Sequence, residues 1–407
     1  MTEKFTKKEV WVVIGAALYY CAAIGLVLNC MGTFLAQIRA EYAFSMARVS
    51  AFNTLRSVSG LLLGALVTRL LFKLDAPRFM MGVIILEVAA FILLAAGADT
   101  LLWFVCPFLI GPSTTVSVTA VPYLLNHRLK HHAGTATGFA MAFSGIAGVI
   151  TNPFSAFLVE TFNWRIALLI LSALTLLMAA LSIWMIFHGG APRTVADATP
   201  ISSKTAQAQK TGPAVKSRFM LCCICFLSGT VCTLFVPLIN IFAEQCGYSI
   251  VIGATMASVI MVGNLLGKVV CGVLCDLVGT WKSMILCIAC VLLGTLGFLF
   301  LQRYLPALYL SALLFGFSYS LGAVGVTKTM MQAYGVQASK RYSGIHTSIN
   351  SGIAAAASLG IGTLHDITGS FQPVLIMMCI LSASSLISVF LLMHQCKDDP
   401  QSQVASQ

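Results

Sequence analysis

Twelve long apolar runs dominate the sequence and limit the folds that it can adopt. Each run has roughly 18 or more residues, enough for an α-helix to cross the hydrocarbon core of a bilayer. Only helices and closed barrels satisfy their backbone hydrogen bonds in lipid, and these runs are too long and too continuously apolar for barrel strands. The sequence therefore predicts an all-α membrane protein with twelve transmembrane helices. The predicted spans are 10–33, 47–72, 79–97, 101–125, 133–159, 166–187, 219–243, 250–275, 283–301, 306–330, 342–363 and 373–394.

The composition excludes most classes of soluble protein. Hydrophobic residues make up 58% of the chain and charged residues 9%, whereas soluble domains carry roughly 25% charged residues. Aqueous enzymes, nucleic-acid-binding proteins and disordered scaffolds are therefore excluded. Cys222 and Cys225 have the spacing of half a metal site, but no second pair or nearby histidine completes it. No paired acids or phosphate-binding glycine loop indicate a membrane enzyme, and neither a metal ion nor a cofactor is predicted.

The basic residues predict the orientation of the chain. With the N-terminus inside, the cytoplasmic segments hold 18 of the 24 Lys and Arg residues, the outer loops hold four, and two lie within spans. This asymmetry predicts a multi-pass protein of the inner (cytoplasmic) membrane with both termini in the cytoplasm. It also accounts for the net charge of +11 without a nucleic-acid partner.

The chain divides into two related halves. A proline- and serine-containing polar stretch after span six predicts a flexible linker. The predicted organisation is a cytoplasmic tail at 1–9, a six-helix bundle at 10–188, a cytoplasmic linker at 189–218, a second six-helix bundle at 219–394 and a cytoplasmic tail at 395–407. Two short matches relate the bundles, Gly64–Thr68 to Gly272–Asp276 at an offset of 208 and Ser144–Ala147 to Ser351–Ala354 at 207. The agreement of the offsets indicates an internal duplication, which recurs in secondary transporters.

A motif after span eight resembles the loop signature of the major facilitator superfamily. Gly272, Asp276, Gly279 and Lys282 match its pattern Gly-x-x-x-Asp-x-x-Gly-x-x-Lys/Arg. The glycines allow close helix approach and a tight turn, and in the family the acid takes part in a charge relay that holds one conformation. The resemblance implies two pseudo-symmetric six-helix bundles and a role for these four residues in conformational gating. In the first half Thr68 replaces the acid, and the second glycine is missing.

Three further stretches resemble the branch that contains oxalate/formate antiporters and monocarboxylate transporters. They are Asn264–Asp276 in span eight, Phe162–Arg165 before span six and Gly362–Phe371 before span twelve. The branch usually has an arginine at the position of Lys268, which implies an anion ligand there. The chain departs from the branch at Asn264, where animal monocarboxylate transporters carry an aspartate. Span one lacks the basic residue and the Asp-Gly/aromatic motif of those transporters, and span eleven lacks the basic residue of the oxalate carrier.

Three charged residues, Arg56, Glu87 and Lys268, lie inside predicted spans. A charge at the bilayer centre costs about 2.5–3.5 kcal/mol, so each is a functional candidate. Lys268, with Asn264 one turn away on the same face, is expected to bind the substrate anion, and the alternative is snorkelling to the headgroups. Arg56 is either a second ligand or half of an ion pair that holds span two. Glu87 carries the coupling proton, pairs with Arg56 or stays protonated in lipid.

Other polar residues are expected to line the path or to join helices through hydrogen bonds. They are Tyr20, Asn29, Asn152, Tyr319 and Asn350. Span four carries Pro107, Gly111, Pro112 and Pro122, which suit a hinge.

Together these features predict a secondary transporter for a small organic anion that works by alternating access. Two cations against one acid favour a negative substrate, and the missing second cation in span eleven favours monocarboxylates. Anion exchange and proton symport are both compatible with the residues. The alternatives are an exporter of a larger amphipathic compound or drug and a non-transporting receptor, while duplicated halves disfavour a channel. The protein is expected to act as a monomer in the lipid bilayer.

Overall fold

Helices make up nearly all of the chain that the structure describes. The computed structural model describes residues 6–129, 133–191 and 213–397, and these ranges contain no strand. Nine helices within these ranges are long and apolar enough to cross a membrane, and a shorter apolar helix covers Leu305–Ser320. The all-α prediction is therefore confirmed.

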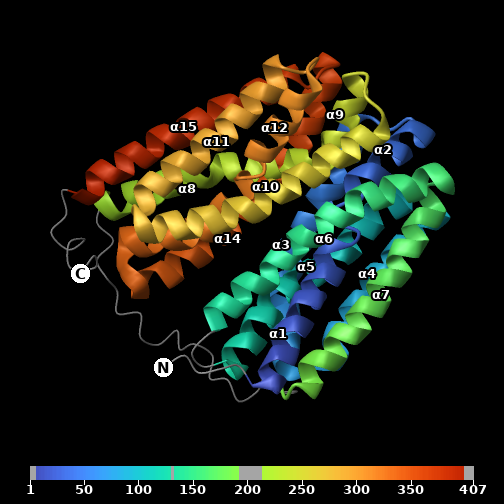
Figure 1. Ribbon diagram of the computed structural model, residues 1–407, viewed down its shortest axis with the longest axis horizontal. Helices are drawn as coiled ribbons and strands as arrows, with labels where there is room; N and C mark the ends of the chain where they lie inside the picture. Colours follow the sequence, from blue (N-terminus) through green and yellow to red (C-terminus); the bar gives the residue numbers. More distant parts are fainter. Residues whose placement is uncertain (1–5, 130–132, 192–212, 398–407) are drawn as a thin grey trace.

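Each half of the chain forms one helical bundle (Figure 1). The first half comprises α1 (Lys7–Tyr20), η1 (Cys21–Gly25), α2 (Met31–Tyr42), α3 (Met46–Lys73), α4 (Ala76–Ala96), α5 (Thr100–Arg128), α6 (Ala133–Thr161) and α7 (Trp164–His188). The second half comprises α8 (Pro213–Phe235), η3 (Val236–Leu238), α9 (Ile239–Gln245), α10 (Ile250–Leu277), α11 (Thr280–Phe300), α12 (Leu305–Phe315), α13 (Ser318–Ser320), η4 (Leu321–Gly325), α14 (Val326–Thr368) and α15 (Gln372–Lys397). Most of the predicted linker lies outside the described residues, and α8 begins inside its predicted range.

Spans one, seven and ten are interrupted rather than continuous. In span one, the π-helical turn η1 and a turn at 26–30 separate α1 from α2. In span seven, the 3₁₀ turn η3 contains Pro237, which has no N–H to continue the α-helical ladder. In span ten, α13 and the π-helical turn η4 follow α12. Such interruptions, when buried in protein, are common where transporters bind their substrates.

The predicted spans ten and eleven end and begin at 330 and 342, but α14 is assigned as helix throughout its 43 residues, including the stretch between them. A straight helix of that length would measure about 65 Å, twice the bilayer core. Its contacts show that α14 is not straight. The rings of Tyr334 and Tyr342 are stacked with centroids 4.3 Å apart, although eight residues of straight helix rise by about 12 Å. The helix therefore reverses direction and supplies the end of span ten and all of span eleven.

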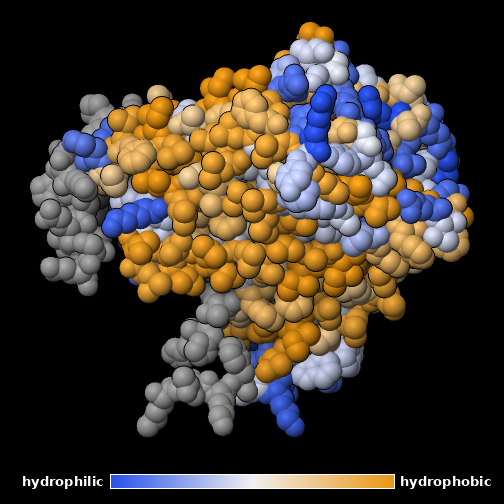
Figure 2. Space-filling view, turned by 45° about the horizontal axis from the view of Figure 1, so that its top comes forward, coloured by the Kyte–Doolittle hydropathy of each residue, from blue (hydrophilic) through white to orange (hydrophobic). Residues whose placement is uncertain are grey.

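The two halves meet at one end of the molecule and separate toward the other (Figure 1). We call the end that carries the start of α1 and the end of α15 the termini side, and the other end the opposite side. One cluster of buried apolar residues draws on both halves, whereas a second cluster draws only on the first half. Figure 2 shows hydrophobic side chains over the flank of the molecule and hydrophilic ones gathered mainly where the halves meet.

The helix bounds support the internal duplication but place it in a different register. The helices α3 and α10 both have 28 residues, and α10 begins 204 residues after α3. The helices α4 and α11 both have 21 residues and are also offset by 204. The sequence matches gave 208, so the helix bounds differ from them by one helical turn.

The Trp-Arg pair before span six ties α7 to α2. The Arg165 guanidinium donates to both Glu41 carboxylate oxygens at 2.9 and 2.6 Å, and the Trp164 indole N–H donates to one of them at 2.6 Å. These hydrogen bonds lower the pKa of the Glu41 carboxyl. The interaction joins the first and sixth spans on the opposite side.

Candidate functional site

The first contact between the halves joins α6 to α10. Pro153 has no N–H, so the Val149 carbonyl lacks its usual helical partner. Ser258 of α10 donates its hydroxyl to this carbonyl at 2.9 Å. Closer to the termini side, Gly145 of α6 faces the Asn264 side chain, with 3.5 Å between a Cβ built at Gly145 and the amide nitrogen. The proline thus creates a polar contact between the halves.

The second contact joins α3 to α14. Ser358 donates its hydroxyl to the Ser50 carbonyl at 2.9 Å, and Thr54 donates to the Ala355 carbonyl at 3.0 Å. Both helices run from this contact toward the termini side, where the bundles separate (Figure 1). The contact therefore closes the opposite side.

Lys268 lies on α10 one helical turn beyond Asn264, the last of the residues described above in contact with α6. Ser258, Met261 and Asn264 of α10 all contact α6, and their spacing places Lys268 on the same face, one turn closer to the termini side. The side chain is partly buried, and no acidic residue in the described ranges pairs with it. An ionisable residue at membrane depth with no acidic partner is a candidate for the substrate path.

Arg56 lies on α3, two residues beyond the Thr54 contact. Its guanidinium interacts electrostatically with Glu87 of its own half and with Tyr319 of the other half. Its Nε has no hydrogen-bond partner in the described part of the chain. Arg56 is therefore placed between the two halves and retains a free donor.

The proline-rich helix α5 packs closely against α3 at Arg56. A Cβ at Gly111 would lie 2.9 Å from the Arg56 carbonyl oxygen, so a larger residue would push the helices apart. Pro112 leaves the Phe108 carbonyl without a helical partner. Ser59 of α3 donates to this carbonyl at 2.5 Å. The predicted hinge in span four thus has one of its free carbonyls satisfied by the neighbouring span.

Glu87 is buried among the helices of the first half, with a side chain only 1% exposed. Ser113 of α5 donates its hydroxyl to the Glu87 carboxylate at 2.5 Å, and Tyr19 of α1, whose hydroxyl donates to the Met80 carbonyl at 3.2 Å, lies nearby. Sequence reasoning missed Ser113 and Tyr19. The sequence could have indicated Ser113 through its distance from the turn between α4 and α5. Glu87 lies ten residues before Gly97 and Ser113 lies 13 residues after Thr100, so the two residues lie at similar depths in neighbouring helices.

The remaining predicted lining residues lie in different surroundings. Asn29 donates to the Ser144 carbonyl of α6 at 2.6 Å, and Asn152 donates to the Gly148 carbonyl at 2.6 Å. Asn350 accepts a hydrogen bond from Thr230 within the second half. The hydroxyl of Tyr20 and the amide oxygen of Asn264 are buried without partners in the described ranges. The bonds of Asn29 and Asn350 join different segments, as the interhelical alternative expects, whereas the bond of Asn152 lies within α6.

The predicted gating motif forms an ion pair within the second half. Asp276 accepts from the Lys328 ammonium at 2.7 Å, joining α10 to α14 on the termini side. Gly279 has φ +93°, a left-handed conformation that glycine favours, and it forms the tight turn before α11. A Cβ at Gly272 would meet nothing within 4 Å, so the close helix approach expected there is wrong. Lys282 is exposed.

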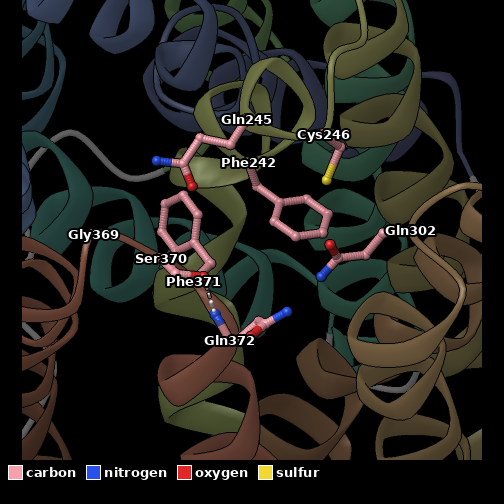
Figure 3. A pocket seen from close by; sticks show the side chains of 8 residues that line it. All are labelled: Phe242, Gln245, Cys246, Gln302, Gly369, Ser370, Phe371 and Gln372. Carbon is pink, nitrogen blue, oxygen red and sulfur yellow. Dashed lines mark hydrogen bonds between the residues drawn. The ribbon is translucent and has the colours of Figure 1, made fainter.

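A separate pocket of about 280 Å³ opens on the opposite side of the second half (Figure 3). Its lining residues are Phe242, Gln245, Cys246, Gln302, Gly369, Ser370, Phe371 and Gln372. None of them is charged, and none belongs to the predicted site. The pocket therefore lacks the counter-charge that an organic anion requires.

The two cations lie at different depths. Arg56 is ten residues from the start of α3, about 15 Å along its axis, and Lys268 is 18 residues from the start of α10, about 27 Å. Both helices start on the opposite side, and no electrostatic interaction links the two cations. Arg56 thus lies near Tyr319 of the other half, while Lys268 lies closer to the termini side.

Curated relatives are monocarboxylate transporters. The chain is 25% identical to monocarboxylate transporter 13 of Rattus norvegicus over 277 residues, which cover 66% of this chain and 61% of the rat protein. It is 24% identical to monocarboxylate transporter 13 of Bos taurus over 373 residues, which cover 89% of this chain and 84% of the bovine protein. The rat match thus spans about three fifths of that relative's length.

The fold matches solved transporters. The nucleoside transporter NupG superposes with a TM-score of 0.69 at 14% identity, covering 97% of this chain and all of NupG. A point mutant of NupG gives 0.72 at 15% identity, covering 96% and 100%. At these identities the likeness concerns the fold alone. The model of the Major Facilitator Superfamily matches residues 14–359. With that match and this twelve-helix fold, the chain belongs to the major facilitator superfamily.

Proposed function

We propose that this protein is a secondary transporter that moves a small organic anion, a monocarboxylate, across the cytoplasmic membrane by alternating access. The observation that carries the proposal is Lys268, a membrane-depth cation without an acidic partner on the face of α10 that turns toward the other half. Arg56, with its free Nε, adds a second positive group between the halves. The relatives named monocarboxylate transporter support the same substrate class.

The proposed function also implies which side of the carrier is open. The basic residues favour a cytoplasmic termini side. In this proposal the protein is an inward-facing carrier, which is supported by halves that touch on the opposite side and separate on the termini side (Figure 1). Anion exchange and proton symport both fit this cycle, and the transporter works as a monomer without a cofactor.

A thermal-shift screen of the purified protein tests the substrate class. Ligand binding stabilises the folded state by RT ln(1 + [L]/Kd), about 2.7 kcal/mol at a hundredfold excess over Kd. We expect acetate, lactate, pyruvate or benzoate to raise the melting temperature, and the Lys268→Ala protein to show no such rise. Nucleosides and cationic drugs serve as comparison ligands. Stabilisation by these compounds and by none of the monocarboxylates would refute the proposal.

We further expect monocarboxylates to compete better than dicarboxylates. A second carboxylate needs its own counter-charge in a region of low dielectric, and Arg56 lies about 12 Å nearer the opposite side than Lys268 along the helix axes. Inhibition of uptake by lactate and pyruvate should therefore exceed inhibition by oxalate and malonate. If the dicarboxylates are the better inhibitors, and Arg56→Gln reverses that order, then Arg56 and Lys268 bind one substrate together.

A further inference from the structure

One carboxylate joins the two halves at the end where they meet. Asp366 lies in α14, near the end of span eleven, and its two oxygens accept from backbone N–H groups at the start of α3. The distances are 2.7 Å from the Met46 nitrogen and 2.7 Å from the Ala47 nitrogen. The partners are 320 and 319 residues apart in sequence. Side chains rarely cap a helix across such a distance, because caps are usually local.

The cap completes the first turn of α3. The first N–H groups of any helix lack partners within the helix. Ser45 accepts only from the Arg48 N–H, at 3.2 Å, so Met46 and Ala47 depend on Asp366. A carboxylate at a helix N-terminus also interacts favourably with the helix dipole, and two charge-assisted hydrogen bonds are stronger than neutral ones.

The backbone around Asp366 holds the carboxylate in place. A Cβ at Gly362, one turn earlier, would lie 2.4 Å from the Met46 carbonyl oxygen, so α14 and α3 cross at van der Waals contact. Gly369, with φ +69°, ends α14 three residues after Asp366. The Ser358–Ser50 hydrogen bond continues the same crossing toward the middle of the molecule.

We propose that Asp366 is a latch that keeps the halves closed on the opposite side. Opening this side requires the carboxylate to leave α3 and exposes two helix N–H groups. The latch therefore favours the conformation that opens toward the termini side when no substrate is bound. That its release is a step of transport rests on the proposed alternating-access function, whereas the latch itself is a property of the substrate-free protein.

Spin-label distances measure the latch directly. Phe162 and Tyr304 are exposed on the opposite side, one in each half. Because the chain has 14 cysteines, both positions should carry a keto-bearing amino acid labelled with a hydroxylamine nitroxide. Without substrate, we expect Asp366→Ala to raise the ratio of long to short separations about tenfold, the scale of losing a helix cap. Asp366→Glu should keep most of the short population.

Two matched controls isolate the hydrogen bonds. Glu160→Gln removes an exposed carboxylate of the same side and should leave the distances unchanged. Met46→Pro removes one donor at the first helical position, where proline is well tolerated, and Met46→Leu loses the methionine but keeps the N–H. Met46→Pro should therefore shift the distances in the same direction as Asp366→Ala, and Met46→Leu should match the wild type. Unchanged distances in Asp366→Ala, or equal distances in Met46→Pro and Met46→Leu, would overturn the latch.

These distances are measured without substrate, so their outcome is independent of the transport assays. A protein that opens on loss of the cap but carries no monocarboxylate would retain the latch and refute the proposed substrate. If the protein carries monocarboxylates but the spin-label distances do not change on loss of the cap, the proposed substrate is supported and the latch is refuted.

Discussion

Replacing Lys268 with alanine is expected to abolish monocarboxylate uptake. Removing one partner of a buried charged contact costs about 2–5 kcal/mol, which corresponds to a loss of roughly 30-fold or more. Lys268→Arg should retain a measurable part of the uptake, because it keeps the charge and offers a forked grip on a carboxylate. Initial rates in liposomes that contain equal amounts of protein measure the effect.

Lys73→Ala is the matched control for this change, because Lys73 is an exposed lysine at the end of α3. Its uptake should equal that of the wild type. Normal uptake by a well-folded Lys268→Ala protein would remove Lys268 from the site and leave Arg56 as the remaining anion ligand.

The second large effect is expected at Glu87. Its carboxylate is buried and accepts from Ser113, and Arg56 is the cation that interacts with it. If substrate binding occupies Arg56, the carboxylate loses its counter-charge, and taking up a proton avoids the cost of an unpaired buried charge. Glu87→Gln should then abolish the pH dependence of net uptake while leaving exchange between preloaded liposomes intact.

Glu160→Gln serves again as the control, since this exposed carboxylate is remote from Arg56 in the sequence and has no role in the proposal. Wild-type pH dependence in Glu87→Gln would show that Glu87 is structural. The protein would then be an exchanger, or a residue outside this group would carry the proton.

The hydrophobic pattern was sufficient to predict the helical class, because runs of apolar residues report directly on length in the bilayer. It missed the interruptions in spans one, seven and ten. Cys21–Gly25 and Leu321–Gly325 are as apolar as their neighbours, and hydropathy does not distinguish a π-helical turn from an α-helical one. The helical continuity of α14 was missed for the opposite reason, since its polar middle resembles a loop.

From the sequence, the site could be predicted only for residues that stand out by their charge. Arg56, Glu87 and Lys268 stand out because ionisable groups inside spans are rare. The proximity of Arg56 to Tyr319 depends on how the two halves pack, which no single span encodes. Asp366 illustrates the same limit. In the sequence it is an acid in a turn, and its role in capping α3 appears only when two segments about 320 residues apart are brought together.

Uptake of radiolabelled monocarboxylates by liposomes that contain the purified protein tests the central claim most directly. The account predicts saturable uptake of at least one of acetate, lactate, pyruvate and benzoate, inhibited by the others and lost in Lys268→Ala. Saturable uptake of a nucleoside or a cationic drug, with no uptake of any monocarboxylate, would contradict it.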